Sequence, residues 1–360
     1  MPFEPTKPYN SLPLLPPDAE LETAAVLKQC IAANKAVAEL KGFGESIPNQ
    51  SLLIRAISLQ EARVSSEIEN IVTTTDDLYQ ALADSLTNGS PQTKEVLRYQ
   101  EALNSGFRAL QQRPVLSTSL FCELASRIKQ HDMAIRTMPG TRIEGTGHRI
   151  IYTPPEGEQT IRTKLQNLEN YINDDTTKVD PLIKMAVMHY QFEAIHPFTD
   201  GNGRTGRILN VLYLVQQGLL KLPVLYLSKY LILNKNDYYA GLRAVTEKKA
   251  WVEWVMFMLI AIEHTAIETQ KKMVDIRDLM ASTQEEIATK LPRIYSKDLV
   301  ELLFYYPYCK RHFLEQKKLA SRNTAYSYLR SLEEIGILSS VRAGRELYFV
   351  NRRLLNILTS

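Results

Sequence analysis

The sequence has few cysteines and no strong excess of charge of either sign. Its 360 residues include only Cys30, Cys122 and Cys309, which are far apart and form no Cys-x-x-Cys pair. Such a set argues against a disulfide framework or a cysteine zinc site, and it predicts reduced, mostly buried thiols in a cytoplasmic protein. The net charge is only +3. Composition therefore indicates neither a nucleic-acid-binding nor a membrane-surface protein, and any basic patch has to be local.

Long apolar runs are also missing. Residues 1–18 are rich in proline and contain no apolar core of a signal peptide, and no later segment is both long and uncharged enough to span a bilayer. The sequence thus predicts a soluble protein without a membrane partner, which begins with an extended, packed arm. Hydrophobic residues make up 44% of the chain, enough for the cores of two or three domains.

A glycine-rich stretch at residues 196–207 concentrates the chemistry of the chain. It reads His-Pro-Phe-Thr-Asp-Gly-Asn-Gly-Arg-Thr-Gly-Arg. Before it, Asp180 and Pro181 suit the N-cap and first position of a helix whose apolar spacing leads to His196. After it, apolar spacing predicts a second helix that ends near Gly218. The glycines therefore mark the N-terminus of a helix.

Such a helix start predicts an anion site. Free backbone amides and the helix dipole attract phosphate, and glycine lets phosphate oxygens approach closely. Arg204 and Arg207 add two forked donors. Asp200 is placed to hold a divalent cation such as Mg²⁺ between phosphate oxygens, and His196 is a candidate general base. The spacing fits neither a P-loop, which has Lys-Ser or Lys-Thr after its last glycine, nor a dinucleotide fold, which has a preceding strand.

These residues resemble the motif of the Fic (Fic/Doc) family, His-Pro-Phe-x-Asp/Glu-Gly-Asn-Gly-Arg-x-x-Arg, at every fixed position. The resemblance implies a mostly helical enzyme that transfers AMP from Mg²⁺-ATP to a side-chain hydroxyl of a target protein, or of itself. It makes His196 catalytic and Asp200 the metal ligand. Tyr239 resembles an adenine contact of the family, although Thr246 stands where the family has a neighbouring asparagine. The implied ATP-binding residues are Gly201, Asn202, Gly203, Arg204, Gly206, Arg207 and Tyr239.

A predicted helix over residues 51–70 contains a second signature. Its end reads Ser65-Ser66-Glu67-Ile68-Glu69-Asn70, which fits the pattern Ser/Thr-x-x-x-Glu-Gly/Asn of self-inhibited Fic proteins. Ser65 and Glu69 are four apart and share a helix face. The resemblance implies that Glu69 pairs with Arg207 and silences the enzyme, while Glu67 is expected to be a solvated charge.

Residues 141–155 have the composition of a short hairpin with a glycine turn. This hairpin resembles the Fic flap, an edge that holds a target segment by strand addition. The resemblance makes Ile150, Ile151 and Tyr152 docking residues, and an ordinary surface hairpin is the alternative.

A smaller unit is expected from Pro292 onward. Three helices (299–305, 313–319 and 321–335) and a hairpin (338–350) follow in the order of a winged helix. Acidic residues, Glu333, Glu334 and Glu346, dilute its basic face, so protein contact or homodimer formation stays open beside DNA binding. The residues that would face a nucleic-acid groove or lie on the wing are Arg322, Asn323, Tyr326, Arg330, Arg342 and Arg345.

The sequence as a whole predicts a mainly α protein with a small flap and a C-terminal winged-helix (α+β) domain. The expected parts are a helical region (1–110) with the inhibitory helix at about 51–70, a catalytic core (111–270) with flap (141–155) and motif (196–207), a helical linker (271–291) and the winged-helix-like domain (292–360). The predicted function is a protein adenylyltransferase for a Ser, Thr or Tyr hydroxyl, because family members that transfer other groups replace the Gly-Asn-Gly-Arg section. The alternative is a nucleotide-sensing transcription regulator that binds DNA through 292–360.

Overall fold

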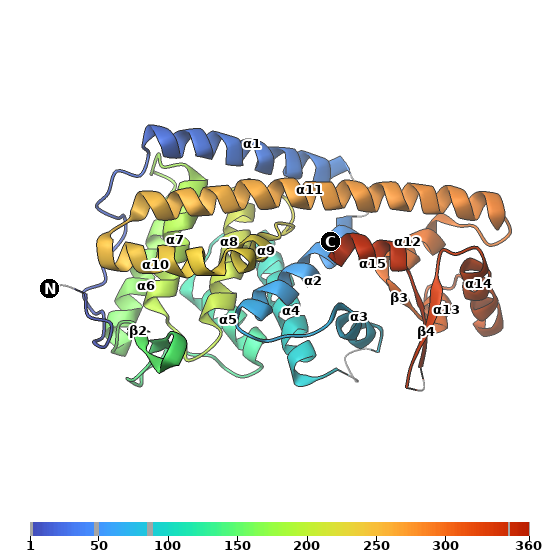
Figure 1. Cartoon of the computed structure of the whole chain (residues 1–360), viewed down its shortest axis with the longest axis horizontal. Helices are drawn as coiled ribbons and strands as arrows, with labels where there is room; N and C mark the ends of the chain where they lie inside the picture. The colour runs from blue at the N-terminus through green and yellow to red at the C-terminus, as the bar shows by residue number, and fades with distance from the viewer. Residues whose placement is uncertain (1–2, 47–49, 85–88, 345, 360) are drawn as a thin grey trace.

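One long helix organises the molecule, which is mainly helical as predicted. The computed structural model describes residues 3–46, 50–84, 89–344 and 346–359. Helix α11 (Trp251–Lys290) runs along its whole length, and α1 (Ala24–Ser46) lies beside the first half of α11 (Figure 1). The side-chain amide of Gln29 on α1 donates to Glu263 of α11 at 2.5 Å. The helical stretch expected over 271–291 is thus the second half of α11, since neither glycine nor proline interrupts residues 251–290.

Most other helices pack below α11 in Figure 1. Several begin with a side-chain cap that the sequence supplies: Thr74 caps α3, Ser90 caps α4 and Ser117 caps α5. The elements up to α11 are α2 (Gln50–Ile68), α3 (Thr75–Ala83), α4 (Pro91–Gln112), α5 (Thr118–Lys129), β1 (Ile143–Glu144), the 3₁₀ turn η1 (Thr146–His148), β2 (Ile150–Tyr152), α6 (Glu158–Asn173), α7 (Pro181–Ile195), α8 (Asn202–Gln216), α9 (Leu227–Leu233) and α10 (Lys235–Lys248).

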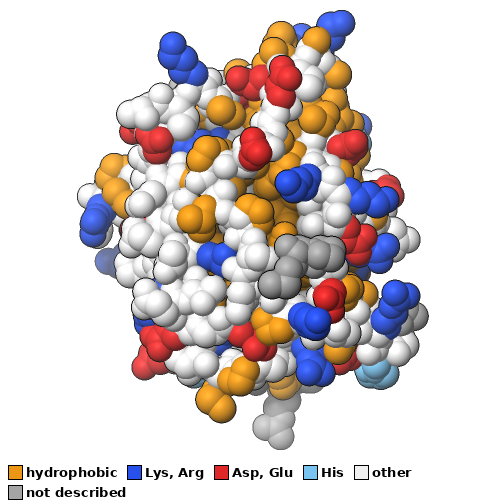
Figure 2. Space-filling view, turned by 90° about the vertical axis from the view of Figure 1, so that its left-hand side faces the viewer, with side chains coloured by type: hydrophobic (Ala, Val, Ile, Leu, Met, Phe, Trp, Pro, Cys, Tyr) orange, Lys and Arg blue, Asp and Glu red, His pale blue; other side chains and the backbone are white. Residues whose placement is uncertain are grey.

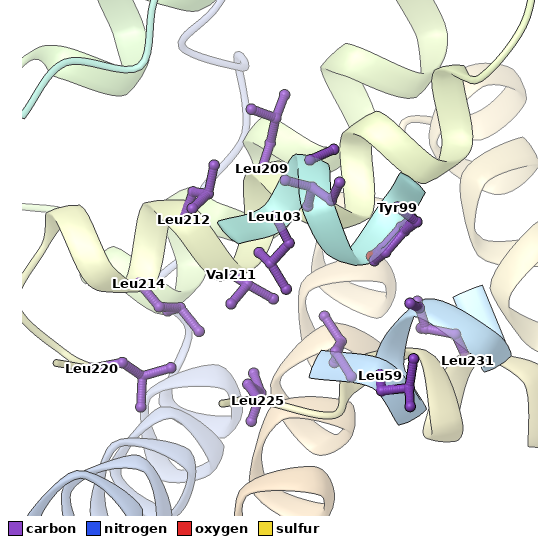
Figure 3. Packing of buried hydrophobic residues seen from close by; sticks show 14 of the residues in the cluster. Leu59, Tyr99, Leu103, Leu209, Val211, Leu212, Leu214, Leu220, Leu225 and Leu231 are labelled. Carbon is purple, nitrogen blue, oxygen red and sulfur yellow. The ribbon is translucent and has the colours of Figure 1, made fainter. Parts of the chain in front are cut away.

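The core joins α2 and α4 to α8, the helix that leaves the glycine-rich turn. Figure 3 shows Leu103 of α4 among Leu209, Val211 and Leu212 of α8. Gly106 on α4 permits this approach, because a Cβ there would lie 2.6 Å from a methyl carbon of Leu212. The packing fixes α2 relative to α8. It therefore also fixes the relative position of the two predicted signatures, residues 65–70 and 196–207.

The C-terminal part contains the three helices and the hairpin that were predicted. They are α12 (Lys297–Tyr305), α13 (Arg311–Gln316), α14 (Arg322–Glu334), β4 (Ser339–Ala343) and β5 (Glu346–Val350). Two further elements were not anticipated, namely β3 (Tyr308–Cys309) and α15 (Arg352–Thr359). Strand β3 pairs with β5, which gives a sheet of order β3-β5-β4. It is only two residues long and therefore shows no alternation in the sequence.

The N-terminal arm packs against the flap and the core. The backbone N–H of Tyr9 donates to the carbonyl of Thr153 at 3.0 Å, and the Thr153 hydroxyl donates to Pro5 at 2.7 Å. Leu12 and Leu15 are buried, whereas Leu14 stays exposed. The three cysteines are free thiols, as predicted. Nowhere in the described ranges is a helix both long and apolar enough to cross a membrane.

Candidate functional site

The glycine-rich turn joins two buried helices, α7 and α8. Asp180 caps α7 by accepting from the N–H of Leu182, with Pro181 at the first position. His196 ends α7 in the left-handed conformation at φ 49°, and Gly201 precedes α8 at φ 78°. A side chain would be strained at position 201, so glycine lets the chain reverse there. Helix α8 begins with backbone amides that have no partner inside the helix.

Asn202 closes the loop with its own side chain. Its amide oxygen accepts from the N–H of Phe198 at 2.8 Å, and its amide nitrogen donates to the carbonyl of Phe198 at 2.8 Å. The residue is buried. The side chain of Asn202 therefore shapes the turn, and only its backbone is left to contact a ligand.

Arg207 is buried and tied to the end of α2. Its Nε donates to the hydroxyl of Ser65 at 2.8 Å, and its Nη2 donates to the Ser65 carbonyl at 2.8 Å and to Oε1 of Glu69 at 2.9 Å. Burial opposes the charge of Glu69, but the Arg207 guanidinium outweighs it and lowers the pKa of this carboxyl. A Cβ on Gly203 would collide with the Glu69 carboxylate, so the carboxylate lies directly against the glycine turn.

His196 is held neutral in the same place. Burial, followed by the nearby Arg136 guanidinium, lowers the pKa of His196 to about 4. The sequence gives no sign of this lowered pKa, because it does not reveal that the fold partly covers the side chain of His196. The neutral form is the one that can accept a proton, so His196 is in the protonation state that a general base needs.

Asp200 lies in a network of charges rather than alone. Its Oδ2 is 2.6 Å from Nζ of Lys129, and its Oδ1 is 3.6 Å from Nη2 of Arg204. Glu95 completes the network, since its Oε1 is 2.6 Å from Nη1 of Arg204 and 3.0 Å from Nζ of Lys129. Within the described ranges no three His, Cys, Asp or Glu side chains gather to bind a metal ion. One half-exposed carboxylate still fits Mg²⁺, which commonly takes one or two carboxylates together with phosphates and water.

A cavity of about 370 Å³ connects His196 and Arg207 with the flap and α10, and the residues around Asp200 do not line it. His196, Gly203, Arg207 and Glu69 line one part. Another part contains Tyr238, Tyr239, Tyr190 and Thr246, where Tyr190 and Thr246 share a hydrogen bond of 3.0 Å. Tyr239 is 40% exposed and available to a ligand, whereas buried Tyr238 bonds His189 at 2.8 Å. The cavity thus has a charged part and an aromatic part.

The predicted hairpin forms from β1 and β2, with Ile143 opposite Tyr152. Ile151 lines the cavity, and Ile150 lies on an adjoining surface hollow with Arg149. Tyr152 is buried and its hydroxyl donates to the carbonyl of Ala194 at 2.7 Å. Its side chain therefore anchors the hairpin to α7, while Ile150 and Ile151 stay available. Figure 2 shows the end of the molecule that carries the arm, where acidic and basic side chains are interspersed.

Sequence reasoning missed two residues that shape the site. Arg136 donates to the backbone carbonyls of His196 at 2.8 Å and Pro155 at 2.5 Å, which joins the motif to the end of the flap. Glu193 lies against Gly206, where a Cβ would collide with its carboxyl group, and burial raises the pKa of Glu193 to about 7. Neither residue belongs to a sequence pattern, so no local signal identifies them.

The residues predicted to face a nucleic-acid groove lie on α14 and the wing. Arg322, Asn323 and Tyr326 are exposed, but Arg330 is engaged by Glu333 at 2.6 Å and by the Tyr326 hydroxyl at 2.9 Å. Arg342 lies on β4 and is exposed, and Arg345 is outside the described residues. Glu333 therefore neutralises part of the positive charge on this face.

Comparison with known proteins identifies three matching family models. They are "Fic/DOC family N-terminal" at residues 27–108, "Fic/DOC family" at 115–214 and "Protein adenylyltransferase SoFic-like, C-terminal domain" at 279–354. Together they cover most of the chain, and the second includes the glycine-rich turn.

Named relatives match a short part of the chain. The protein adenylyltransferase fic-1 of Caenorhabditis elegans is 34% identical over 89 residues, which are 24% of this chain and 16% of the relative. A probable protein adenylyltransferase of Aquifex aeolicus (strain VF5) is 36% identical over 96 residues, 27% of each chain. The matched region thus spans about a quarter or less of these two relatives.

Solved structures match over a larger part. A Fic family protein from Desulfovibrio desulfuricans G20 superimposes with a TM-score of 0.59 at 19% identity, covering 91% of this chain and 96% of the other. A C. elegans Fic-1 structure gives 0.55 at 20% identity, covering 70% and 73%. These likenesses concern the fold. The three matching models and the intact motif at 196–207 show that the chain belongs to the Fic/DOC family.

Proposed function

We propose that the protein transfers AMP from ATP to the hydroxyl of a Ser, Thr or Tyr side chain in a target protein. The observation that carries this proposal is one cavity that holds a neutral imidazole, a helix N-terminus and a buried arginine. His196, Gly203 and Arg207 line that cavity together. The names of the relatives, protein adenylyltransferases, agree with this reaction.

His196 acts as the base in the proposed step. Its neutral ring takes the proton of the target hydroxyl while the oxygen attacks the α-phosphorus of ATP. The new phosphorus–oxygen bond replaces the bond to pyrophosphate, which leaves, and AMP remains on the target. The backbone amides at the start of α8, from Asn202 to Arg204, supply donors to the phosphate oxygens where negative charge develops.

Arg204 and Arg207 bind the rest of the phosphate chain, and Asp200 holds Mg²⁺. The cation, when bound, neutralises phosphate charge and orients the chain. Arg204 is kept in position by Glu95, so its guanidinium is fixed before the nucleotide arrives. Tyr239 offers an aromatic face to adenine. Thr246 bonds Tyr190, so the family's asparagine contact has no equivalent side chain at this position.

The flap selects how the target enters. Ile150 and Ile151 are the side chains that remain available to a target segment, whereas Tyr152 holds the hairpin on α7. Strand addition would use backbone hydrogen bonds and would specify little about the side chains of the target. The protein itself is a further acceptor under this proposal, and a cytoplasmic location fits its free thiols.

Self-inhibition belongs to the same proposal. Glu69 takes the Arg207 donor that would otherwise bind the γ-phosphate, and its carboxylate lies against Gly203. ATP then cannot bind with its α-phosphate aligned for attack. The isolated enzyme is expected to be nearly silent.

Labelled ATP tests the reaction. Incubation of the full chain with target lysate and ATP labelled at the α-phosphate should give labelled protein, and ATP labelled at the γ-phosphate should not. The Glu69→Gly variant is the form to use, because no carboxylate then pairs with Arg207 at this position. Protein label from the γ-phosphate alone would show phosphorylation instead and refute AMP transfer.

A further inference from the structure

The ammonium of Lys129 forms an ion pair with Asp200, the carboxylate that would hold the metal. Lys129 Nζ lies 2.6 Å from Oδ2 of Asp200 and 3.0 Å from Oε1 of Glu95. Glu95 also receives Arg204 at 2.6 Å, and Arg204 approaches Asp200 to 3.6 Å. Two cations and two anions therefore form a closed ring beside the turn.

Lys129 is placed for more than neutralising its neighbours. It is the last residue of α5, and its aliphatic stem crosses Gly201, where a Cβ would be 3.7 Å from both Cγ and Cδ. Its side chain is 19% exposed, compared with 2% for Arg204. The ammonium thus lies at the start of α8 and can still exchange partners, whereas the arginine is fixed.

Asp200 has one oxygen to offer. Its Oδ1 accepts from the N–H of Gly201 at 2.5 Å, and its Oδ2 carries Lys129. Mg²⁺ binds oxygen directly at about 2.0 to 2.1 Å and needs an oxygen that no ammonium occupies. The divalent cation and Lys129 therefore compete for Oδ2.

We propose that Lys129 is a phosphate-binding residue that rests on Asp200 and gives up this carboxylate to the divalent cation when the nucleotide binds. This inference rests on the proposed function. Because Glu95 and the stem over Gly201 restrain it, the ammonium can shift only a short distance. The nearest new anion is then a phosphate at the N-terminus of α8. The ligand class is the polyphosphate chain of a nucleotide, including the pyrophosphate that leaves.

The alternative is that Lys129 only balances the charges of Glu95 and Asp200. Its loss would then disorder the ring and weaken the binding of every ligand. Under the proposal, its loss affects two ligands in opposite directions. A divalent cation alone finds Asp200 unoccupied, while a phosphate loses a charged donor.

The test measures two ligands separately on the full chain carrying Glu69→Gly, so that Glu69 does not hold Arg207. The affinity for Mn²⁺ alone is measured by electron paramagnetic resonance, and the affinity for inorganic pyrophosphate at saturating Mg²⁺ by calorimetry. Adding Lys129→Met should tighten Mn²⁺ binding by roughly three- to tenfold, as expected for removal of an adjacent positive charge. It should weaken pyrophosphate binding by about tenfold, the effect of one charge-assisted hydrogen bond.

Further variants complete the test. Lys94→Met makes the same change on α4, next to Glu95 in the sequence, and should alter neither affinity. Lys129→Arg keeps the charge and should leave both affinities within about threefold of the parent. Lys129→Gln, a second change that removes the charge, keeps the test decisive if Lys129→Met unfolds, because opposite changes of the two affinities support the proposal and a loss of both overturns it.

Unchanged or jointly weakened affinities in folded Lys129→Met would likewise overturn the proposal. Opposite changes of the Mn²⁺ and pyrophosphate affinities in a protein that never transfers AMP would support the phosphate-binding role of Lys129 and refute the proposed function. Efficient AMP transfer, with both affinities unchanged in Lys129→Met, would support the proposed function and refute that role of Lys129.

Discussion

The carboxylate of Glu69 lies 2.9 Å from the guanidinium of Arg207, although the two residues are 138 positions apart. Glu69 follows directly after α2, and Arg207 lies in the first part of α8. Ser65 provides two more acceptors to the same guanidinium. The end of α2 thus occupies the arginine that the proposed reaction needs for phosphate.

Replacing Glu69 by Gly should activate the enzyme. The change removes a charge-assisted bond of about 1.5 to 3 kcal/mol, so the blocked state should lose roughly one to two decades of occupancy. Self-modification and target labelling from α-labelled ATP should both rise accordingly. Glycine is tolerated here because residue 69 lies beyond the last residue of α2.

Glu67→Gly is the matched control. Glu67 is partly exposed and pairs with Arg63 at 3.2 Å, away from Arg207. Its loss should change labelling little, since exposed pairs contribute about 0 to 1 kcal/mol. Wild-type labelling in Glu69→Gly together with a rise in Glu67→Gly would refute the inhibitory role of Glu69.

His196→Ala should abolish transfer in the Glu69→Gly background and leave ATP binding within a few-fold of the parent. The imidazole acts on the target hydroxyl, whereas the nucleotide is held by α8 and the arginines. Label transfer and equilibrium ATP binding measure the two effects. His131, which is exposed, provides the control His131→Ala. Transfer that persists in His196→Ala would exclude this base.

Local signals account for what the sequence predicts well. The Asp180 cap, Pro181 and the glycines lie within a few residues of the helix ends that they determine, so α7, the turn and α8 follow from the sequence. The pair of Glu69 and Arg207 depends on how α2 packs on α4 and α8. It could be expected only through the family resemblance.

The ring around Asp200 could not be predicted. Glu95 and Arg204 are 109 positions apart and belong to different helices, and Lys129 enters from a third. Glu95 and Lys129 look like ordinary helix-surface charges in the sequence, and only Arg204 belongs to the motif. Tertiary packing alone makes them one network.

Acid should destabilise the protein through two histidines, His189 and His196, whose pKa values are lowered. Burial lowers the pKa of His189 to about 3 and that of His196 to about 4, below the value near 6.5 of an unfolded chain. Between these values the unfolded state binds more protons, so stability falls as pH decreases from about 6.5 towards 4. Thermal unfolding at a series of pH values measures this slope. His196→Ala should make it shallower, and an unchanged slope would show that His196 does not carry a lowered pKa.

The same lowered pKa predicts the pH range of catalysis. His196 remains a neutral base down to about pH 4 to 5, so the acid limb of transfer in Glu69→Gly should lie well below 6.5. Glu69 itself raises the pKa of His196, so its removal shifts the limb further down. Single-turnover rates between pH 4.5 and about 8 test this. An acid limb of the transfer rate near pH 6.5 would show that the pKa of His196 is not lowered in the active enzyme.

Tyr152 offers a way to separate target binding from nucleotide binding. Its hydroxyl donates to the carbonyl of Ala194 at 2.7 Å, and this bond fastens the flap to α7 two residues before His196. Tyr152→Phe keeps the buried ring and removes only the donor, which should cost roughly 0.5 to 1.5 kcal/mol of flap anchoring. The flap would then sample positions from which a target strand cannot be held beside the base, so the KM for the target should rise about two- to tenfold.

ATP binding should hardly change, because the phosphates are held by α8. Tyr171→Phe is the control, since Tyr171 is a buried tyrosine of α6 that does not line the cavity. An equal rise in the KM values for target and ATP would mean that Tyr152 supports the whole cavity rather than the flap.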